Sequence, residues 1–456
     1  MYSRAHTTPL REQPPEPLLT QRQILFFYLP LAASWLLMTL EGPSINAAIA
    51  RLPHAATMIA AYGIMIGLSV TIESPVIQLL GTTTALTHDR QSYLQLRRFT
   101  IHLNLVLTVI AFLVGWTSLY DVIVRQIMDV PTAIADAAQP GMRIMLLWTA
   151  AIGWRRFKQG VLIRFGATRR VGYGTLVRLA GSAGTAVGLA LFTDWPGISV
   201  GASALMVGVL SEALFAHVAA RDVMRAHLSP ESPASDGGEL TYHDIVSYHT
   251  PLALANLMLL FAQPIIGAAL SRTPDPETAL AAWPVTFQLL LIVRSPGLAL
   301  PEAVIALLKG PETTRAVRTF SRNLALFALI VLALIAFTPL AQLYFVTLIG
   351  VTPELGAIAI NGVRVGVLIP FLMVWQGYLR GTLMARKHTR PLFTSMGIYL
   401  GTLVAVMLGV GVPLGLPGVS LAAGAIAAAM LFETLYLVRQ QRLTPQRNRQ
   451  PQRAFP

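Results

Sequence analysis

Two stretches of this sequence share one pattern of prolines and arginine. Residues 29–53 read LPLAASWLLMTLEGPSINAAIARLP, and residues 250–274 read TPLALANLMLLFAQPIIGAALSRTP. A shift of 221 residues superimposes three prolines and one arginine of the first stretch on those of the second. Each stretch lies in an apolar run long enough to cross a membrane as a helix, for which about twenty residues are needed. The chain is therefore expected to be a duplicated membrane protein.

The same offset holds through the rest of both halves. Each half carries six apolar runs, and an even number returns the chain to the side on which it started. Both halves then enter the membrane in the same direction, as parallel repeats related by an axis along the membrane normal. The superimposed pairs are Ser74-Pro75 with Ser295-Pro296, Gly141 with Gly362, Arg143 with Arg364, Trp154 with Trp375, Gly160 with Gly381, Pro196-Gly197 with Pro417-Gly418, Ser199 with Ser420, and Glu212 with Glu433.

The composition agrees with a chain that is largely in lipid. Of its 456 residues, 54% are hydrophobic and 12% are charged, and the mean hydropathy is +0.60. Soluble domains carry about 25% charged residues. We predict an all-α polytopic membrane protein with about twelve transmembrane helices in two six-helix lobes. The predicted spans are 24–49, 56–82, 99–119, 138–157, 171–193, 196–219, 245–270, 278–307, 321–346, 355–379, 391–412 and 417–438.

Polar segments mark the expected boundaries of the lobes. A Pro-rich segment at 1–22 and an Arg/Gln/Pro-rich segment at 443–456 are predicted to be disordered cytoplasmic tails. The N-terminal lobe is expected at 23–226 and the C-terminal lobe at 243–442. Between them, residues 227–242 have the Ser, Pro and Gly content of a flexible cytoplasmic linker.

The distribution of basic residues predicts the orientation. With the N-terminus in the cytoplasm, 27 of the 34 Lys and Arg residues fall on the cytoplasmic side, as the positive-inside rule requires. The largest group, Arg155, Arg156, Lys158 and their neighbours up to Arg170, is assigned to one cytoplasmic loop. Both termini are expected in the cytoplasm and the chain in the inner (plasma) membrane. The net charge of +13 then reflects topology and contact with lipids, and no nucleic-acid partner is expected.

Several local motifs resemble those of a known transporter superfamily. They are Gln263-Pro264-Ile265 running to Ser271-Arg272, Leu348-Ile349-Gly350-Val351, Gly362-Val363-Arg364-Val365, and Tyr378 to Met384 with the sequence YLRGTLM. With the duplicated, Pro-rich first helices, they resemble the multidrug/oligosaccharidyl-lipid/polysaccharide (MOP) exporter superfamily. Its multidrug and toxic compound extrusion (MATE) branch is similar in layout, and the progressive ankylosis (pyrophosphate transporter) proteins are the nearest likeness.

This resemblance implies a V-shaped pair of six-helix lobes and the export of polyanions such as pyrophosphate, citrate or nucleotides. One departure bears on the coupling ion. The MATE branch often has an acidic residue in the first helix of each lobe. Here Glu41 takes that place in the first lobe, while Ala262 and Gln263 stand in the second.

Charged residues inside predicted spans are the candidate site. Burying an ionisable group in the membrane costs free energy, so such a group usually contacts a partner or water and often marks a functional site. Arg143 and Arg364, equivalent in the repeat, are candidate anion ligands, since a guanidinium group suits phosphate or carboxylate oxygens. The alternative is that they reach outer lipid headgroups. Arg294 is a third candidate ligand. Glu73 occupies the position equivalent to Arg294, so the two are candidates for a gate pair across the lobes; two unrelated local ion pairs are the alternative.

The remaining carboxylates and amides complete the set. Glu41, beside Gly42-Pro43, is a candidate proton- or cation-binding group, with structural pairing to an arginine as the alternative. Glu212 and Glu433 are candidate coupling or gating groups, and structural pairing, of Glu212 with Arg178, is the favoured interpretation for them. Three amides are candidate cavity ligands or interhelical contacts: Asn46, Asn256 and Gln263.

No enzymatic activity, cofactor or metal is predicted. The chain has no cysteine, no Gly-Lys-Ser/Thr phosphate-binding loop and no His-Glu-x-x-His motif. The energy for transport would come from a gradient of protons, Na⁺ or the substrate, and a monomer suffices. The favoured function is a secondary exporter of small organic or phosphate-rich anions. The alternatives are a drug/cation:proton antiporter of the MATE type, a flippase for a lipid-linked saccharide or phospholipid, and a scaffold or receptor that transports nothing.

Overall fold

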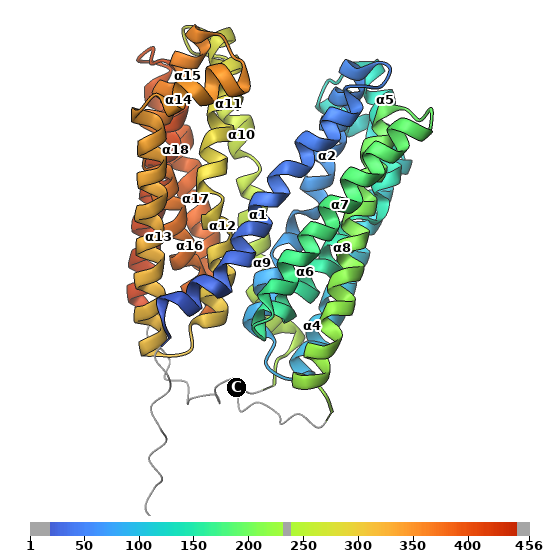
Figure 1. Cartoon of the computed structure of the whole chain (residues 1–456), viewed down its shortest axis with the longest axis vertical. Helices are drawn as coiled ribbons and strands as arrows, with labels where there is room; N and C mark the ends of the chain where they lie inside the picture. Colours follow the sequence, from blue (N-terminus) through green and yellow to red (C-terminus); the bar gives the residue numbers. More distant parts are fainter. Residues whose placement is uncertain (1–18, 231–238, 445–456) are drawn as a thin grey trace, which may run out of the picture.

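The structure, a computed structural model, describes residues 19–230 and 239–444, and these residues form helices and no strand. They make two helical bundles that meet at one end and diverge at the other (Figure 1). The first bundle consists of α1 (Gln21–Ile49), α2 (Ala55–Ile77), α3 (Leu79–Leu86), α4 (Arg90–Trp116), η1 (Asp121–Ile127), α5 (Thr132–Ile144), η2 (Met145–Leu147), α6 (Trp148–Arg164), α7 (Thr168–Phe192) and α8 (Gly197–His227).

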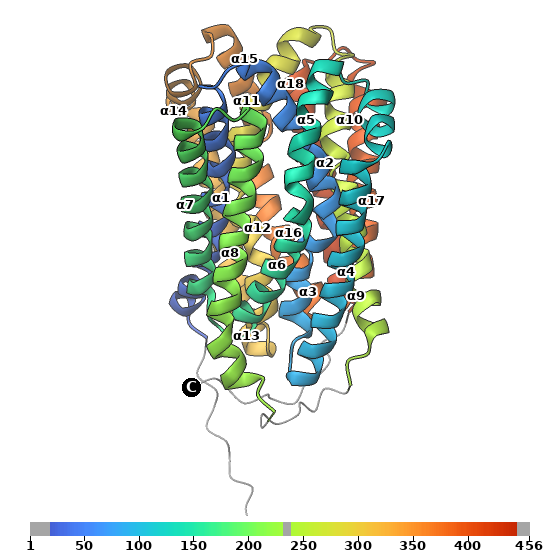
Figure 2. The same ribbon diagram turned by 90° about the vertical axis from the view of Figure 1, so that its right-hand side faces the viewer.

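The second bundle repeats this order. It consists of α9 (Tyr242–Leu259), α10 (Ala262–Leu270), α11 (Pro276–Arg294), α12 (Pro296–Leu307), α13 (Pro311–Phe337), α14 (Leu340–Gln342), η3 (Leu343–Ile349), α15 (Pro353–Val365), α16 (Ile369–Ala385), α17 (Arg390–Val404), η4 (Ala405–Gly411) and α18 (Gly418–Leu443). Seen from the side, the helices of both bundles run along the long axis of the molecule (Figure 2).

Ten helices in the described part of the chain are long and apolar enough to cross a membrane, or eleven if the bent pair α15–α16 counts as one span. About twelve were predicted. The difference lies at the predicted span 138–157, where η2 interrupts the chain between α5 and α6. In addition, α6 is only 17 residues long and carries Arg155, Arg156 and Lys158.

The assignment of Arg155, Arg156 and Lys158 to a cytoplasmic loop was wrong. They lie within α6 and are 2%, 6% and 2% exposed. The helix continues through them because its neighbours supply partners for two of the charges. Arg155 contacts a carboxylate of α8, and the Lys158 ammonium donates to the Tyr93 hydroxyl at 2.7 Å. Three basic residues within four positions are therefore buried in the middle of a helix.

The first helix of each half crosses to the other bundle. α1 packs against α7 and α8 of its own bundle and against α12 and α13 of the second, and α9 packs against α17 and also against α2, α3 and α4 of the first. One continuous apolar core runs through the first bundle and includes residues of the second half, among them Leu300, Val304 and Leu379. A second core, made by the second half alone, stabilises the rest of that bundle.

Two equivalent glycines set the closest helix contacts. A Cβ on Gly160 would lie 2.8 Å from the carbonyl oxygen of Leu80, and a Cβ on Gly381 would lie 2.8 Å from that of Pro301. α6 therefore approaches α3 as closely as α16 approaches α12. This explains why the repeat has glycine at both positions.

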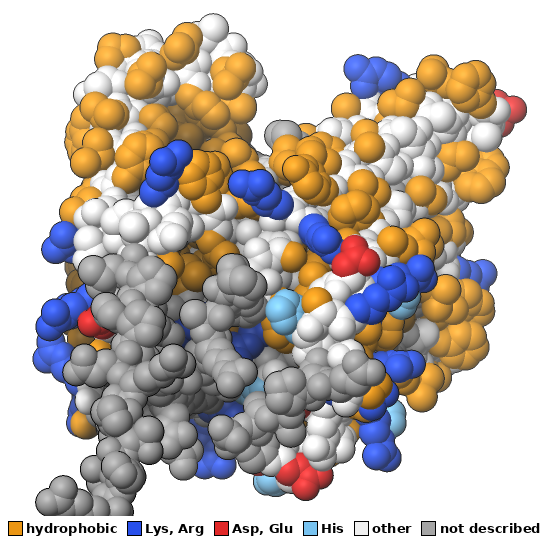
Figure 3. Space-filling view, turned by 60° about the horizontal axis from the view of Figure 1, so that its bottom comes forward, with side chains coloured by type: hydrophobic (Ala, Val, Ile, Leu, Met, Phe, Trp, Pro, Cys, Tyr) orange, Lys and Arg blue, Asp and Glu red, His pale blue; other side chains and the backbone are white. Residues whose placement is uncertain are grey.

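α1 begins and α18 ends at the end where the bundles meet (Figure 1). Lys and Arg side chains are spread over this end, and a hollow separates the bundles at the far end (Figure 3). The predicted tails 1–22 and 443–456 and linker 227–242 lie largely outside the described residues. Where they overlap with them, α1 begins at Gln21 and α8 continues to His227.

Candidate functional site

A buried carboxylate on α8 organises the interior of the first bundle. Glu212 is fully buried, and the Nη1 atom of Arg155 lies 2.5 Å from its Oε2 atom. One turn further along α6, the amide of Gln159 donates to Glu212 Oε1 at 2.9 Å. Residues four apart share one face of a helix, so Arg155 and Gln159 reach both oxygens together. Both carboxylate oxygens of Glu212 are therefore bonded, and the contacts hold α6 against α8.

The second bundle has the same arrangement with two residues exchanged. Glu433, equivalent to Glu212, forms an ion pair with Arg380, accepts from the amide of Gln376 at 3.1 Å and accepts from the Ser395 hydroxyl at 3.0 Å. By the offset, Gln376 stands where α6 has an arginine, and Arg380 where α6 has a glutamine. Each bundle thus has one carboxylate, one guanidinium and one amide at this position. The predicted structural pairing of both glutamates is seen here.

A second set of charged contacts exists in the first bundle. The Nε and Nη2 atoms of Arg178 on α7 donate to the carboxylate of Glu41 on α1 at 2.9 and 2.5 Å. Arg178 also lies 3.7 Å from Glu212 and 5.6 Å from the ring centre of Trp148, whose indole N–H donates to Glu73. These contacts link α1, α2, α6, α7 and α8. Two of the predicted coupling residues, Glu41 and Glu73, are therefore brought into one network with Glu212.

The second bundle lacks this set. The offset puts Ala262 and Tyr399 in the places of Glu41 and Arg178. Arg294, in the place of Glu73, lies 4.9 Å from the ring centre of Phe287, and its Nε atom is buried without a hydrogen-bond partner.

The gate pair proposed from the sequence is not formed in this conformation. Glu73 accepts from the Trp148 indole within the first bundle, and Arg294 stacks on Phe287 within the second. Over residues 19–230 and 239–444, no ion pair joins Glu73 to Arg294.

Two hydrogen bonds related by the repeat hold the bundles together. The buried hydroxyl of Tyr28 on α1 donates to the Pro296 carbonyl of the second bundle at 2.6 Å. The equivalent residue on α9, His249, donates from Nε2 to the Pro75 carbonyl of the first bundle at 3.1 Å, while its Nδ1 accepts from the Thr82 hydroxyl at 2.9 Å. We call these two contacts the inter-bundle clasp.

The clasp is built on the two Ser-Pro breaks. Pro75 lies in the last turn of α2 and Pro296 is the first residue of α12, so the carbonyl groups that accept the clasp hydrogen bonds lie beside the two breaks. An aromatic ring also packs edge-on against each clasp side chain: Phe320 lies 5.4 Å from Tyr28, and Phe99 lies 5.1 Å from His249. Phe99 and Phe320 are themselves 221 residues apart. The contact is thus duplicated with its surroundings.

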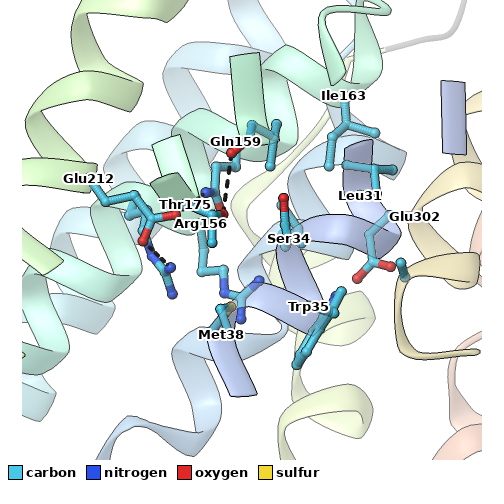
Figure 4. Close-up of a pocket in the computed structure, with 14 residues that line it drawn as sticks. Leu31, Ser34, Trp35, Met38, Arg156, Gln159, Ile163, Thr175, Glu212 and Glu302 are labelled. Carbon is cyan, nitrogen blue, oxygen red and sulfur yellow. Dashed lines mark hydrogen bonds and ion pairs between the residues drawn. The ribbon is translucent and has the colours of Figure 1, made fainter. Parts of the chain in front are cut away.

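Beside the clasp lies a small cavity of about 20 Å³ between the bundles (Figure 4). Its walls come from α1, α3, α6, α7 and α8 of the first bundle and from α12 of the second. The lining residues that the figure labels include Ser34, Trp35, Met38, Arg156, Gln159, Thr175, Glu212 and Glu302. Arg156 lies 5.4 Å from the ring centre of Trp35.

The predicted anion ligands Arg143 and Arg364 have equivalent backbone contacts. Arg143 Nε donates to the Gly115 carbonyl in the last turn of α4 at 3.2 Å, and Arg364 Nε donates to the Ala336 carbonyl in the last turn of α13 at 3.1 Å. An arginine at a helix C-terminus satisfies carbonyls that have no partner within the helix. This capping gives a structural reason for the duplication, and it brings neither residue into the cavity described above.

The three predicted amide ligands lie apart from one another. Asn256 donates to the Ser74 carbonyl across the bundles at 3.1 Å. Gln263 accepts from the Trp283 indole at 3.3 Å within the second bundle, and the Oδ1 atom of Asn46 is buried without a partner. Asn256 therefore belongs with the clasp, and the other two do not.

No family model and no curated protein matches the sequence. Solved structures do match. A MOP superfamily transporter from Pyrococcus furiosus, described as having a binding pocket of reversed polarity, is 13% identical over 93% of this chain and 96% of that one, with a TM-score of 0.73. An outward-facing multidrug resistance MATE family transporter gives the same values. A MATE protein in complex with MaD3S is 16% identical over 94% and 97% of the two chains, with a TM-score of 0.72.

The chain has the MATE fold. This confirms the architecture expected from the duplicated sequence. Within the MATE fold, the cavity between the bundles and the charged set around Arg178 are the candidate site. Sequence reasoning did not select Trp35, Glu302 or the clasp residue Tyr28, and it placed Arg156 in a cytoplasmic loop. One signal in the sequence was available: Arg155-x-x-x-Gln159 aligns with Gln376-x-x-x-Arg380, which places a cationic side chain inside both bundles.

Proposed function

We propose that this chain is a secondary active transporter that works by alternating access of its two bundles, and that its substrate is a small organic or phosphate-rich anion. The observation that carries the proposal is the arrangement of the two bundles in the MATE fold. They are joined at one end by the repeat-related clasp and separated at the other. Breaking a few duplicated contacts at one end and forming others at the far end would expose a central site to each side in turn.

The proposed orientation follows from the basic residues. The described chain ends and many Lys and Arg side chains share the end at which the bundles meet (Figure 3). If this end faces the cytoplasm, as the positive-inside rule favours, the hollow opens outward in this conformation. The chain would then lie in the plasma membrane in contact with lipids, and a monomer would suffice.

An anionic substrate is supported by two guanidinium groups inside the bundles. In the described ranges, neither Arg156 nor Arg294 has a carboxylate within 4 Å, and the Nε atom of each is buried without a hydrogen-bond partner. Guanidinium groups bind carboxylate and phosphate oxygens through paired hydrogen bonds. These two side chains, one from each bundle, can therefore contribute to a site for an anion.

The alternative is a multidrug or cation:proton antiporter, as the MATE neighbours suggest. It would use Glu41 or Glu73 to bind the coupling proton or Na⁺. Glu41 is already paired with Arg178 through two hydrogen bonds. Glu73 has the Trp148 indole as its donor and is the freer of the two.

Uptake by sealed proteoliposomes separates these two functions. Labelled pyrophosphate and citrate are compared with a cationic dye, with and without a pH gradient, using empty vesicles as the blank. Anion uptake above the blank, reduced by Arg294→Gln, supports the proposal. Dye movement driven by the pH gradient and abolished by Glu73→Gln, without anion uptake, replaces it with the antiporter. A lack of movement of any solute contradicts transport itself.

A further inference from the structure

An open groove lies between α9 and α17 on the outer side of the second bundle. Figure 2 shows both helices at the right-hand side of the molecule. The groove has a volume of about 440 Å³, and its lining residues belong to these two helices. Arg390 is the first residue of α17, and Ser247 lies in the second turn of α9, so the groove begins close to the starts of both helices. Because α17 runs opposite to α18, which ends where the bundles meet, the groove lies towards that end of the molecule.

The groove changes from charged to apolar along its length. On α17, Arg390 is followed one turn later on the same face by Thr394. On α9, Thr250 is followed one turn later by Leu254. Phe393 and Leu254 are 40% and 42% exposed, so their apolar surfaces are open to the acyl chains of a membrane. The groove therefore presents a cation and hydroxyl groups near the helix starts, and an apolar surface farther along the helices.

The polar groups of the groove are available to a ligand. In the described part of the chain, Arg390 forms no ion pair, and the hydroxyls of Thr250 and Thr394 form no hydrogen bond. By contrast, the Thr382 hydroxyl in the same bundle donates to the carbonyl one turn earlier at 2.8 Å, which is a common arrangement in helices. The acidic residue at the start of α9, Asp244, is bonded within the capping box of its own helix. It therefore leaves Arg390 without a carboxylate partner.

The repeat does not require these hydroxyl groups. In the places of Ser247, Thr250 and Thr394, the first half has Phe26, Leu29 and Tyr173. Gly172 stands in the place of Phe393, and a Cβ on Gly172 would lie 3.5 Å from the Cβ atom of Pro30, so α7 lies directly against α1. The first half thus folds with a close helix contact and larger, more apolar side chains at these positions. Packing alone does not explain the polar lining in the second half.

We propose that this groove binds an anionic phospholipid from the leaflet at the end where the bundles meet. The guanidinium group of Arg390 pairs with the phosphate oxygens, and the hydroxyls of Thr250 and Thr394 donate to oxygens of the headgroup. One acyl chain lies along Leu254 and Phe393. The volume of the groove is in the range of about 300–1,000 Å³ that small-molecule sites have. A zwitterionic headgroup would bring its own cation close to Arg390, so an anionic lipid is preferred.

The test measures where an anionic lipid gathers around the full chain in a bilayer. The chain has no cysteine, so a bimane fluorophore can be attached at Gly397→Cys, one turn beyond Phe393 on α17. A Cβ at this position would lie 4.0 Å from the Met258 side chain, which is an ordinary van der Waals contact. Leu176→Cys, at the equivalent exposed position of α7, carries the fluorophore in the control protein. Both proteins are placed in nanodiscs with increasing fractions of phosphatidylglycerol or phosphatidylcholine that carry a nitroxide quencher on identical acyl chains.

The labelled anionic lipid should quench the fluorophore in the groove first. We expect half-maximal quenching at position 397 at an about fivefold lower fraction of labelled phosphatidylglycerol than at position 176, because one arginine contributes about this factor to the binding of an anionic headgroup. Labelled phosphatidylcholine should quench both positions alike.

Variants assign this preference to the lining residues. Arg390→Gln should remove the difference between the two positions, and Arg390→Lys, which keeps the charge, should retain part of it. The double change Thr250→Val with Thr394→Val should reduce the difference. Arg169→Gln, which removes the equivalent exposed arginine at the start of α7, should leave it unchanged. Arg390 is exposed, so its variants should unfold at the same temperature as the parent.

Three results would overturn the inference. If both labelled lipids quench position 397 alike, the groove is an apolar surface that does not recognise a headgroup. If soluble glycerol phosphate relieves the quenching by phosphatidylglycerol, the site binds a free phosphate and not a lipid. If the difference persists in Arg390→Gln, the preference comes from other basic residues at this end of the molecule. No transported solute is needed in this experiment, so a failure of the proposed transport function would leave its result unaffected.

Discussion

Loss of the Tyr28 hydroxyl should loosen the end at which the two bundles meet. In Tyr28→Phe, the ring can still pack against Phe320, but the 2.6 Å hydrogen bond to the Pro296 carbonyl is lost. Tyr28 is 2% exposed, so the carbonyl has little access to water. Leaving such an acceptor unsatisfied costs about 1–3 kcal/mol. The cost applies only while the bundles are joined, because a separated carbonyl can be reached by water.

The equilibrium between the joined and the separated state should therefore shift about 5–150-fold for a cost of about 1–3 kcal/mol. The chain has no cysteine, so two spin labels can be attached to introduced cysteines without first replacing a native cysteine. Ala133 on α5 and Glu354 on α15 are exposed, lie near the far ends of the two bundles and are equivalent in the repeat. Spin labels at both positions report the separation of the bundles through the distribution of distances between them.

Tyr248→Phe is the matched control. Its buried hydroxyl donates to the Met384 carbonyl at 3.0 Å, a contact of α9 with α16 inside the second bundle. Tyr248→Phe loses the same kind of hydrogen bond and keeps both clasp hydrogen bonds. We expect the population with a short label distance to rise in Tyr28→Phe and to stay at the parent value in Tyr248→Phe. Equal distributions in the two variants would refute the role given to the clasp.

Further predictions concern the duplicated contacts. The double change Arg155→Gln with Gln159→Arg should fold, because the second bundle uses that order. Arg155→Gln alone should lower stability by about 3–5 kcal/mol, because the buried carboxylate of Glu212 loses its closest cationic partner. Chemical denaturation of both variants checks this. Gly381→Ala should lower the unfolding temperature, because its Cβ would lie 2.8 Å from a carbonyl oxygen, and unchanged unfolding would contradict the close approach. Arg364→Gln should cost about 1 kcal/mol of stability and leave anion uptake unchanged; uptake reduced in a folded variant would restore Arg364 as an anion ligand.

The fold could be predicted from the sequence because its signals are long and duplicated. Apolar runs of about twenty residues define membrane helices, and the offset from Pro30 to Pro251 identifies equivalent helices without any structure. The number of membrane-spanning helices was harder to predict, because of α6. Arg155, Arg156 and Lys158 resemble a loop when only local composition is considered, since their partners Glu212 and Tyr93 are more than fifty residues away. Only packing shows that such a segment is buried.

The candidate site was harder to predict because its contacts join distant helices. Glu41 and Arg178 are 137 residues apart, and the sequence favoured Glu212 as the partner of Arg178. Arg178 in fact contacts both carboxylates, with the shorter distances to Glu41. The sequence does not indicate that Glu302 lies near the first bundle, because the contacts of α12 with α1 and α6 join the two halves of the chain.

Equivalence in the repeat is itself ambiguous evidence of function. Both halves must solve the same packing problem, so a residue present in both is explained first by structure. Arg143 and Arg364 were selected because both halves have them, and both cap a helix. A charged residue that only one half has is not explained in this way, because the other half folds without it. The stronger candidates for function are therefore the charged residues that differ between the halves. These are Glu41, Arg178 and Arg156 in the first half, and Arg294 and Glu302 in the second. In a membrane interior, where each charge must be compensated or used, these asymmetric charges are the ones that a substrate or a coupling ion is expected to contact.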